Sequence, residues 1–125
     1  MTLKELYAEI DGDYDKAMQV LSIEKLLDKH IRKLPENGIF KELDNAAKNM
    51  DETAIFESSH AIKGMCANLG LVKLADMASA VCEEFRPGNE RKLSDKEVKD
   101  SVDEITALFN KTAAAIKEYE QRASL

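Results

Sequence analysis

The sequence of 125 residues has no tryptophan, only two prolines, five glycines and two cysteines. It also has no apolar run that approaches the ~20 residues of a membrane span. Because helix breakers are so few and Ala, Leu, Lys and Glu are abundant, the composition favours helix over sheet. The formal net charge of -6 argues against general nucleic-acid binding, which needs a basic face. The first residues lack the basic and apolar regions of a signal peptide, so we expect a cytosolic protein with no membrane partner.

The two cysteines, Cys66 and Cys82, are too few for a disulfide framework. In a helical hairpin that turns near Gly70, their sulfurs would lie about 10 Å apart along the axis, too far for a disulfide. We therefore expect two reduced cysteines that act as small buried hydrophobic residues. Two histidines and two cysteines in separate segments give no zinc spacing, and the acidic run 11–15 lacks the glycine and bidentate carboxylate of a calcium loop, so we expect no metal.

Apolar residues recur at three- and four-residue spacing almost everywhere, which is the helical period. We expect one domain over residues 1–125. Four long helical segments joined by short breaks predict an all-α fold: an antiparallel four-helix bundle, up-down-up-down, with short N-terminal helices as a lid. The final helix shows one uninterrupted seam from Val98 to Tyr119, as a bundle helix should.

Capping residues and helix breakers predict where these helices begin and end. We expect N-caps at Thr2 and Ser94, each within a capping box, and at Asp13, Ser22 and Asp51. The segment 35–38 should break or kink the third helix, and Gly70 should end the helix that begins after Asp51. His30 lies at the rim of the apolar stripe of Leu26, Leu27 and Ile31, and we expect it to be a half-buried packing residue.

Residues 52–69 carry the one histidine that this periodicity turns away from the core. Wound at about 100° per residue, the helix puts His60 opposite the face that holds Ile55, Ile62 and Leu69. The outer face near His60 also holds Phe56, Lys63, Gly64 and Ala67. An ordinary solvated face would carry Glu, Lys and Gln instead.

This outer face has properties that suit a reacting histidine. Gly64 in mid-helix costs on the order of 1 kcal/mol relative to Ala, and access of another molecule to His60 would explain that cost. Phe56 is an apolar ring on the same face, as expected of a docking patch. Imidazole is a nucleophile that is available in neutral form near neutral pH, and Lys63 could stabilise the charge of an attached phosphoryl group. A merely solvated surface histidine is the alternative that the helical wheel alone leaves open.

The segment His60-Ala61-Ile62-Lys63-Gly64, followed by Gly70, resembles the motif of the histidine-containing phosphotransfer (HPt) domain family. That motif has a His, an aliphatic residue two positions on, then Lys-Gly, and a Gly ten positions after the His. The resemblance covers roughly residues 13–86 and is strongest over 56–70. It implies that His60 accepts a phosphoryl group, that Lys63 neutralises its charge, and that Gly64 admits the partner, with Phe56 and Ala67 on the same docking surface. Met65 and Cys66 depart from the small or hydroxyl residues common in the family at those positions.

The resemblance implies a phosphorelay carrier in two-component signalling, which takes a phosphoryl group from a receiver-domain aspartate and passes it to another. Such a carrier is a monomer, is not an enzyme by itself and needs no cofactor, because the Mg²⁺ belongs to the receiver domain. Its partners would be receiver domains of response regulators, including those of hybrid histidine kinases. Two alternatives stay open: a module that docks a receiver without accepting phosphate, and a structural bundle that oligomerises through its Phe56 face. No Gly-rich phosphate loop is present, so ATP binding is not expected.

Overall fold

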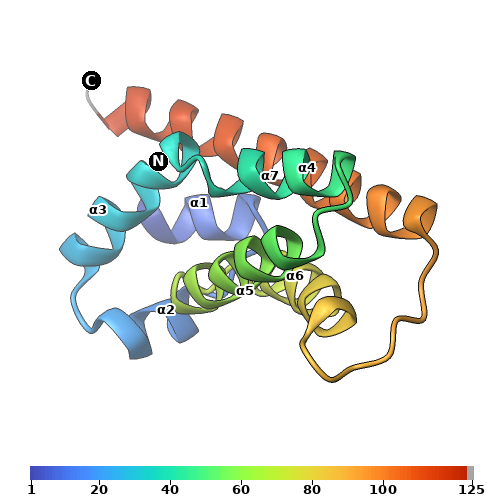
Figure 1. Cartoon of the computed structure of the whole chain (residues 1–125). Coiled ribbons are helices and arrows are strands. Elements are labelled where there is room, and N and C mark those ends of the chain that lie inside the picture. The colour runs from blue at the N-terminus through green and yellow to red at the C-terminus, as the bar shows by residue number, and fades with distance from the viewer. Residues whose placement is uncertain (124–125) are drawn as a thin grey trace.

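The computed structural model describes residues 1–123, and these residues form helices and connecting turns with no strand. In chain order the elements are α1 (Leu3–Glu9), α2 (Tyr14–Leu21), α3 (Glu24–Lys33), the short 3₁₀ helix η1 (Leu34–Glu36), α4 (Ile39–Lys48), α5 (Glu52–Asn68), α6 (Val72–Phe85) and α7 (Asp95–Ala123) (Figure 1). The all-α class predicted from the sequence is confirmed. None of the described helices is both long and apolar enough to cross a membrane.

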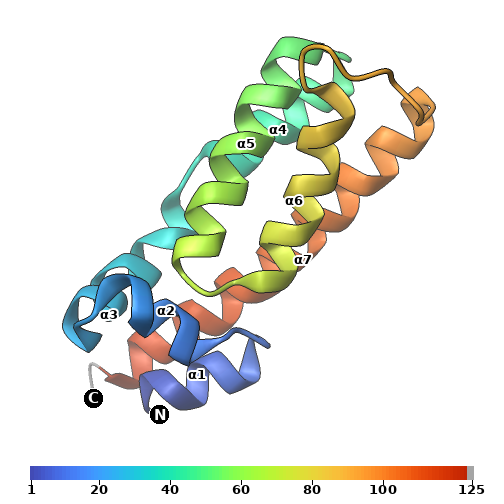
Figure 2. The same ribbon diagram turned by 90° about the horizontal axis from the view of Figure 1, so that it is seen from below.

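Helices α4 to α7 pack against one another in a closed ring. Helix α5 lies between α4 and α6, and α7 contacts both α4 and α6 on the other side. Figure 2 shows α5 and α6 side by side, while α7 extends along the length of the molecule. Helices α1, α2 and α3 gather at one end, where the N-terminus and the end of α7 also lie. The loop between α6 and α7 is at the opposite end.

The core lies inside this ring, on the faces that the apolar periodicity predicts. Along α7 the seam contains Val98, Val102, Ile105, Thr112, Ile116 and Tyr119, all buried. Phe109 of the same seam is half-buried, and its ring stacks on Phe40 of α4 at 4.0 Å between centroids. Each large apolar side chain buried in this way stabilises the fold by roughly 1.5–3 kcal/mol relative to an exposed position.

Most of the predicted helix starts are confirmed. Thr2 and Glu5 form a capping box, the side chains of Asp13 and Asp51 accept hydrogen bonds from the first turns of α2 and α5, and Ser94 exchanges hydrogen bonds with Glu97 before α7. The prediction for Ser22 is wrong. Ser22 ends α2 in a left-handed conformation, with φ 65°, and its N–H bonds back to Met18, so it closes one helix instead of capping the next.

The prediction for His30 is also wrong, because α3 presents a narrower stripe to the core than the sequence suggests. Only Leu27 and Ile31 are buried on this helix. Leu26 is 40% exposed, Ile23 is 57% exposed, and His30 lies on the exposed side. A helix of ten residues at the end of the ring packs through one i, i+4 pair, which leaves its other apolar residues at the surface.

The N-terminal helices hold the turn that ends α5. Gly70 has φ +70°, and a Cβ added to it would lie 2.3 Å from the carbonyl oxygen of Asp13, so the turn requires glycine. The Asp13 N–H donates to the Gly70 carbonyl at 2.8 Å, and the hydroxyl of Tyr7 donates to the Leu69 carbonyl at 2.7 Å. Burial raises the pKa of Tyr7, so this hydroxyl keeps its proton and remains a donor. The end of α5 is therefore tied to α1 and α2.

Candidate functional site

Helix α5 presents His60 on its exposed side because its opposite side is firmly anchored. Ile55 and Ile62 are fully buried. Ser58 and Ser59 are buried too, and their hydroxyls donate to backbone carbonyls one turn earlier at 2.6 and 2.7 Å. These contacts set the rotation of the helix about its axis, and His60 points outward as a result.

The imidazole of His60 is held on one side only. Its ring stacks on Phe56 with centroids 5.8 Å apart and an interplanar angle of 20°. Its Nδ1 lies 3.8 Å from the Sγ of Cys82 on α6. Within residues 1–123, the other ring nitrogen, Nε2, has no hydrogen-bond partner. The ring thus has a supported inner edge and an open outer edge.

Two cations lie near this histidine. Lys63 is half-buried one turn after it on α5. Arg86, at the end of α6, pairs with Glu83 at 2.9 Å and places its guanidinium 5.5 Å from the centre of the Phe56 ring. The hydrogen bonds from Arg86 hold the pKa of the Glu83 carboxyl below its usual value, and the charge of Lys63 contributes to the same shift. Both positive charges are therefore within electrostatic reach of one surface beside His60.

Gly64 opens the surface one turn beyond His60. A Cβ added at Gly64 would meet nothing within 4 Å, in contrast to Gly12 and Gly70, where internal neighbours stand closer than 3 Å. Packing within this chain therefore does not explain a glycine in the middle of α5, although it lowers helix stability by about 1 kcal/mol. Ala67, the next residue on this face, is half-buried.

Phe56 is less available than the sequence suggests. The ring is half-buried, packs against the core and lies between His60 and the Arg86 guanidinium. It supports the histidine and offers only part of its surface to a partner.

Sequence reasoning missed two residues of this site, Cys82 and Arg86. Both lie on α6. Cys82 contacts His60 because the hairpin of α5 and α6 brings residue 82 level with residue 60, and Arg86 contacts the Phe56 ring one turn earlier on α5. The turn at Gly70 gives that register, so counting back along the hairpin could have found them. Cys66 and Cys82 are buried and unpaired, as predicted, and burial raises the pKa of the Cys66 thiol to about 12.

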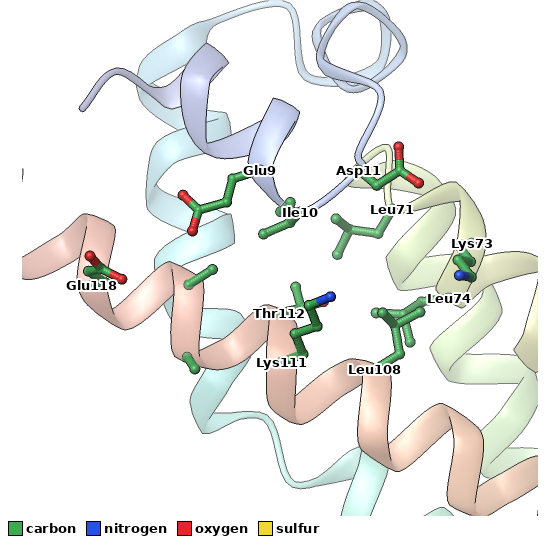
Figure 3. Close-up of a pocket in the computed structure, with 12 residues that line it drawn as sticks. Glu9, Ile10, Asp11, Leu71, Lys73, Leu74, Leu108, Lys111, Thr112 and Glu118 are labelled. Carbon is green, nitrogen blue, oxygen red and sulfur yellow. The ribbon is translucent and has the colours of Figure 1, made fainter.

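A cavity near the N-terminal helices is separate from this surface. Its volume is about 340 Å³, and it lies between the end of α1, the start of α6 and the middle of α7. Figure 3 shows Ile10, Leu71, Leu74, Leu108 and Thr112 around it, with Glu9, Lys111 and Glu118 nearby. None of its lining residues belongs to α5, so this cavity is not part of the candidate site at His60.

The fold and the site define a helical domain in which the exposed His60 has two cations near it. A comparison with protein-family models gives a match to the Hpt domain over residues 17–117, which includes His60 and all the helices from α3 to α6. The chain belongs to the Hpt domain family. No curated protein and no solved structure matches it. Family membership implies a phosphotransfer role in two-component signalling, carried out with receiver domains of response regulators, in which the domain is a carrier and not a conventional enzyme.

Proposed function

We propose that His60 is the phosphoryl carrier of this domain: it accepts a phosphoryl group from an aspartate of one receiver domain and passes it to another. The observation that carries the proposal is the open outer edge of His60 beside the space at Gly64. The other histidine, His30, is also exposed, but within the described residues it has no hydrogen-bond, ion-pair or ring partner to orient it.

The transfer that we propose needs little from this chain beyond position and charge. A lone pair of the imidazole forms a bond to phosphorus, the bond from phosphorus to the aspartate oxygen breaks, and the electron pair leaves with the carboxylate. Lys63 and Arg86 would stabilise the negative charge of the transferred group, because phosphoryl transfer depends mainly on alignment and charge neutralisation. Mg²⁺ and the acidic pocket that binds it would belong to the receiver domain, so the chain itself needs no cofactor.

The receiver would approach over α5, with Gly64 and Ala67 leaving room and Phe56 adding apolar contact. This proposal includes the antiparallel up-down-up-down arrangement of α4 to α7 with α1 and α2 as a lid, in one domain over residues 1–125. It also takes the carrier to be a cytoplasmic monomer, since a stable dimer through the Phe56 face would cover His60.

Transfer from a receiver charged with ³²P-labelled acetyl phosphate tests the proposal. Wild-type protein should acquire label that is acid-labile and base-stable, as a phosphohistidine is. His60→Gln should acquire none, while the matched variant His30→Gln should label like wild type.

Other outcomes would contradict the proposal. A receiver that binds the wild-type protein without transferring label would make the domain a docking module only. A stable dimer in sedimentation, with no label on either histidine, would favour a structural bundle.

A further inference from the structure

The cavity at the junction of α1, α6 and α7 has a largely apolar wall (Figure 3). Leu71 and Leu74 at the start of α6 are buried, while Ile10 at the end of α1 and Leu108 of α7 are half-buried. An apolar cavity of roughly 150 Å³ is large enough to bind benzene. The cavity described here has a volume of about 340 Å³, so it has room for one ring with its substituents.

One buried hydroxyl borders this apolar space. Thr112 belongs to the buried seam of α7, is 3% exposed and lines the cavity (Figure 3). Within residues 1–123 its side chain has no hydrogen-bond partner. The hydroxyl is not sealed inside the protein either, because among these residues the one sealed side-chain atom without a partner is Nε of Arg91. Thr112 can therefore donate to, or accept from, a molecule that enters the cavity.

The other buried polar side chains of the described residues find their partners within the chain. The hydroxyls of Ser58 and Ser59 donate to backbone carbonyls at 2.6 and 2.7 Å. The carboxylate of Glu84 accepts from two backbone N–H groups at 2.9 and 2.7 Å. Buried polar groups are almost always hydrogen-bonded, because leaving a bond unmade costs the desolvation of the group. The partner of Thr112 must therefore come from outside the chain, either as water or as a ligand that displaces it.

The charged residues around the cavity balance one another. Lys73 and Lys111 are exposed cations, and Glu9 and Asp11 are exposed anions. The third carboxylate, that of Glu118, already has an arginine partner at 2.6 Å. Figure 3 shows Glu9 and Lys73 on opposite sides of the cavity. Because these charges cancel, they favour neither an anion nor a cation, and a neutral molecule costs less to transfer from water into an apolar space.

We propose that this cavity binds a small neutral molecule, an aromatic ring with one hydroxyl group. The ring would lie among Leu71, Leu74 and Leu108, and its hydroxyl would form a hydrogen bond with Thr112. An apolar lining with a few placed polar groups is typical of a small-molecule site. No lining residue belongs to α5, so this site is separate from the surface at His60 and does not depend on the function proposed for it.

Titration of the full chain with 4-methylphenol, followed by amide NMR, tests the proposal. Toluene is the matched probe, because it has the same ring and methyl group but no hydroxyl. We expect 4-methylphenol to bind with a Kd below about 1 mM and to shift the amide signals of Leu71, Leu74 and Thr112. Benzoate and benzylamine are similar in size but charged, and they should bind about tenfold more weakly.

Two variants separate the hydroxyl from the space. Thr112→Val keeps the shape of the side chain but removes the hydrogen-bonding group. It should weaken binding of 4-methylphenol roughly three- to tenfold and leave binding of toluene unchanged, since only the phenol loses a hydrogen bond. Ala115→Phe fills the cavity and should abolish binding of both probes, whereas Ala107→Phe, at an exposed position of α7 outside the cavity, should not. If Ala115→Phe does not fold, as judged by circular dichroism, Ala115→Leu is measured in its place.

Four results would overturn the proposal. Binding of no probe would mean that the cavity holds only water, and stronger binding of benzoate or benzylamine would mean that its ligand is charged. Equal losses for 4-methylphenol and toluene in Thr112→Val would remove the role of the hydroxyl. A stable dimer in sedimentation that dissociates in Ala115→Phe would make a second copy of the chain the occupant.

Discussion

Replacing Gly64 should make the protein more stable and the relay slower. A Cβ at this position meets nothing within 4 Å, so Gly64→Ala gains the helix propensity of alanine without a clash. That gain is about 0.8 kcal/mol in the free energy of unfolding. The unfolding entropy of a 125-residue chain is about 0.26 kcal/mol/K, so the melting temperature should rise by about 3 °C.

The rate of phosphoryl transfer should fall as the side chain added at position 64 becomes larger. Gly64→Gln places a longer polar group in the space beside His60, where it would keep the receiver from closing on the imidazole. A displacement of 1 Å in a reacting pair can reduce the rate by orders of magnitude, so we expect at least a tenfold slower transfer for Gly64→Gln and a smaller effect for Gly64→Ala. Single-turnover transfer from a charged receiver, followed on a quench-flow time scale, measures both rates.

The control is Ala107→Gln, which adds a glutamine to an exposed position of α7, a helix that lies across the ring from α5. It should transfer at the wild-type rate. If Gly64→Gln also transferred at that rate, Gly64 would have no part in partner access. If both Gly64 variants were less stable than wild type, that result would contradict the open space that surrounds a Cβ at this position.

Three further predictions concern charge, the α5–α6 turn and pH. Lys63→Ala should slow transfer several-fold with unchanged helical circular dichroism, while Lys63→Arg keeps most of the rate; equal rates for alanine and wild type would remove the neutralising role. Gly70→Ala should lower the free energy of unfolding in urea by about 2–4 kcal/mol, because the alanine needs a positive φ and its Cβ meets the Asp13 carbonyl, and a near-neutral result would contradict the close approach. The Ser94 cap holds the pKa of Glu97 below its usual value, so this carboxylate contributes stability above its unfolded pKa and loses it as the pH falls through its folded pKa. The melting temperature of wild type should therefore fall more steeply below about pH 4.5 than that of Glu97→Gln, and parallel curves would show that the cap carries no such linkage.

Much of the fold follows from sequence patterns that act within a single helix. Capping at Thr2, Asp13 and Asp51 depends only on residues within one turn, and those predictions hold. The errors occur where tertiary placement decides. Ser22 has the right chemistry for an N-cap, but the chain reverses there in a left-handed conformation, and the short α3 then buries too little of its surface to include His30.

The candidate site also contains residues whose placement depends on one helix and residues whose placement depends on tertiary packing. The outward direction of His60 follows from winding α5 with Ile55 and Ile62 toward the core, so the sequence alone could predict it. Cys82 and Arg86 lie on another helix, and their distance from His60 depends on the register of the hairpin, which one residue of slip would change. Residues that act across two helices are therefore harder to find from the sequence than residues on one.

A carrier that must give up what it accepts should not hold a phosphoryl group too tightly, and the charges around His60 suit that requirement. Lys63 and Arg86 are the cations beside the ring, and Arg86 is already paired with Glu83 at 2.9 Å. On the proposed function, a phosphoryl group on His60 would compete with the Glu83 carboxylate for the same guanidinium, so part of its attraction to the cation is offset. Removing that competition in Glu83→Gln should therefore make the phosphorylated state longer-lived and slow its return to a receiver. The site would then favour storage of the phosphoryl group over its transfer, which is the opposite of what a relay needs.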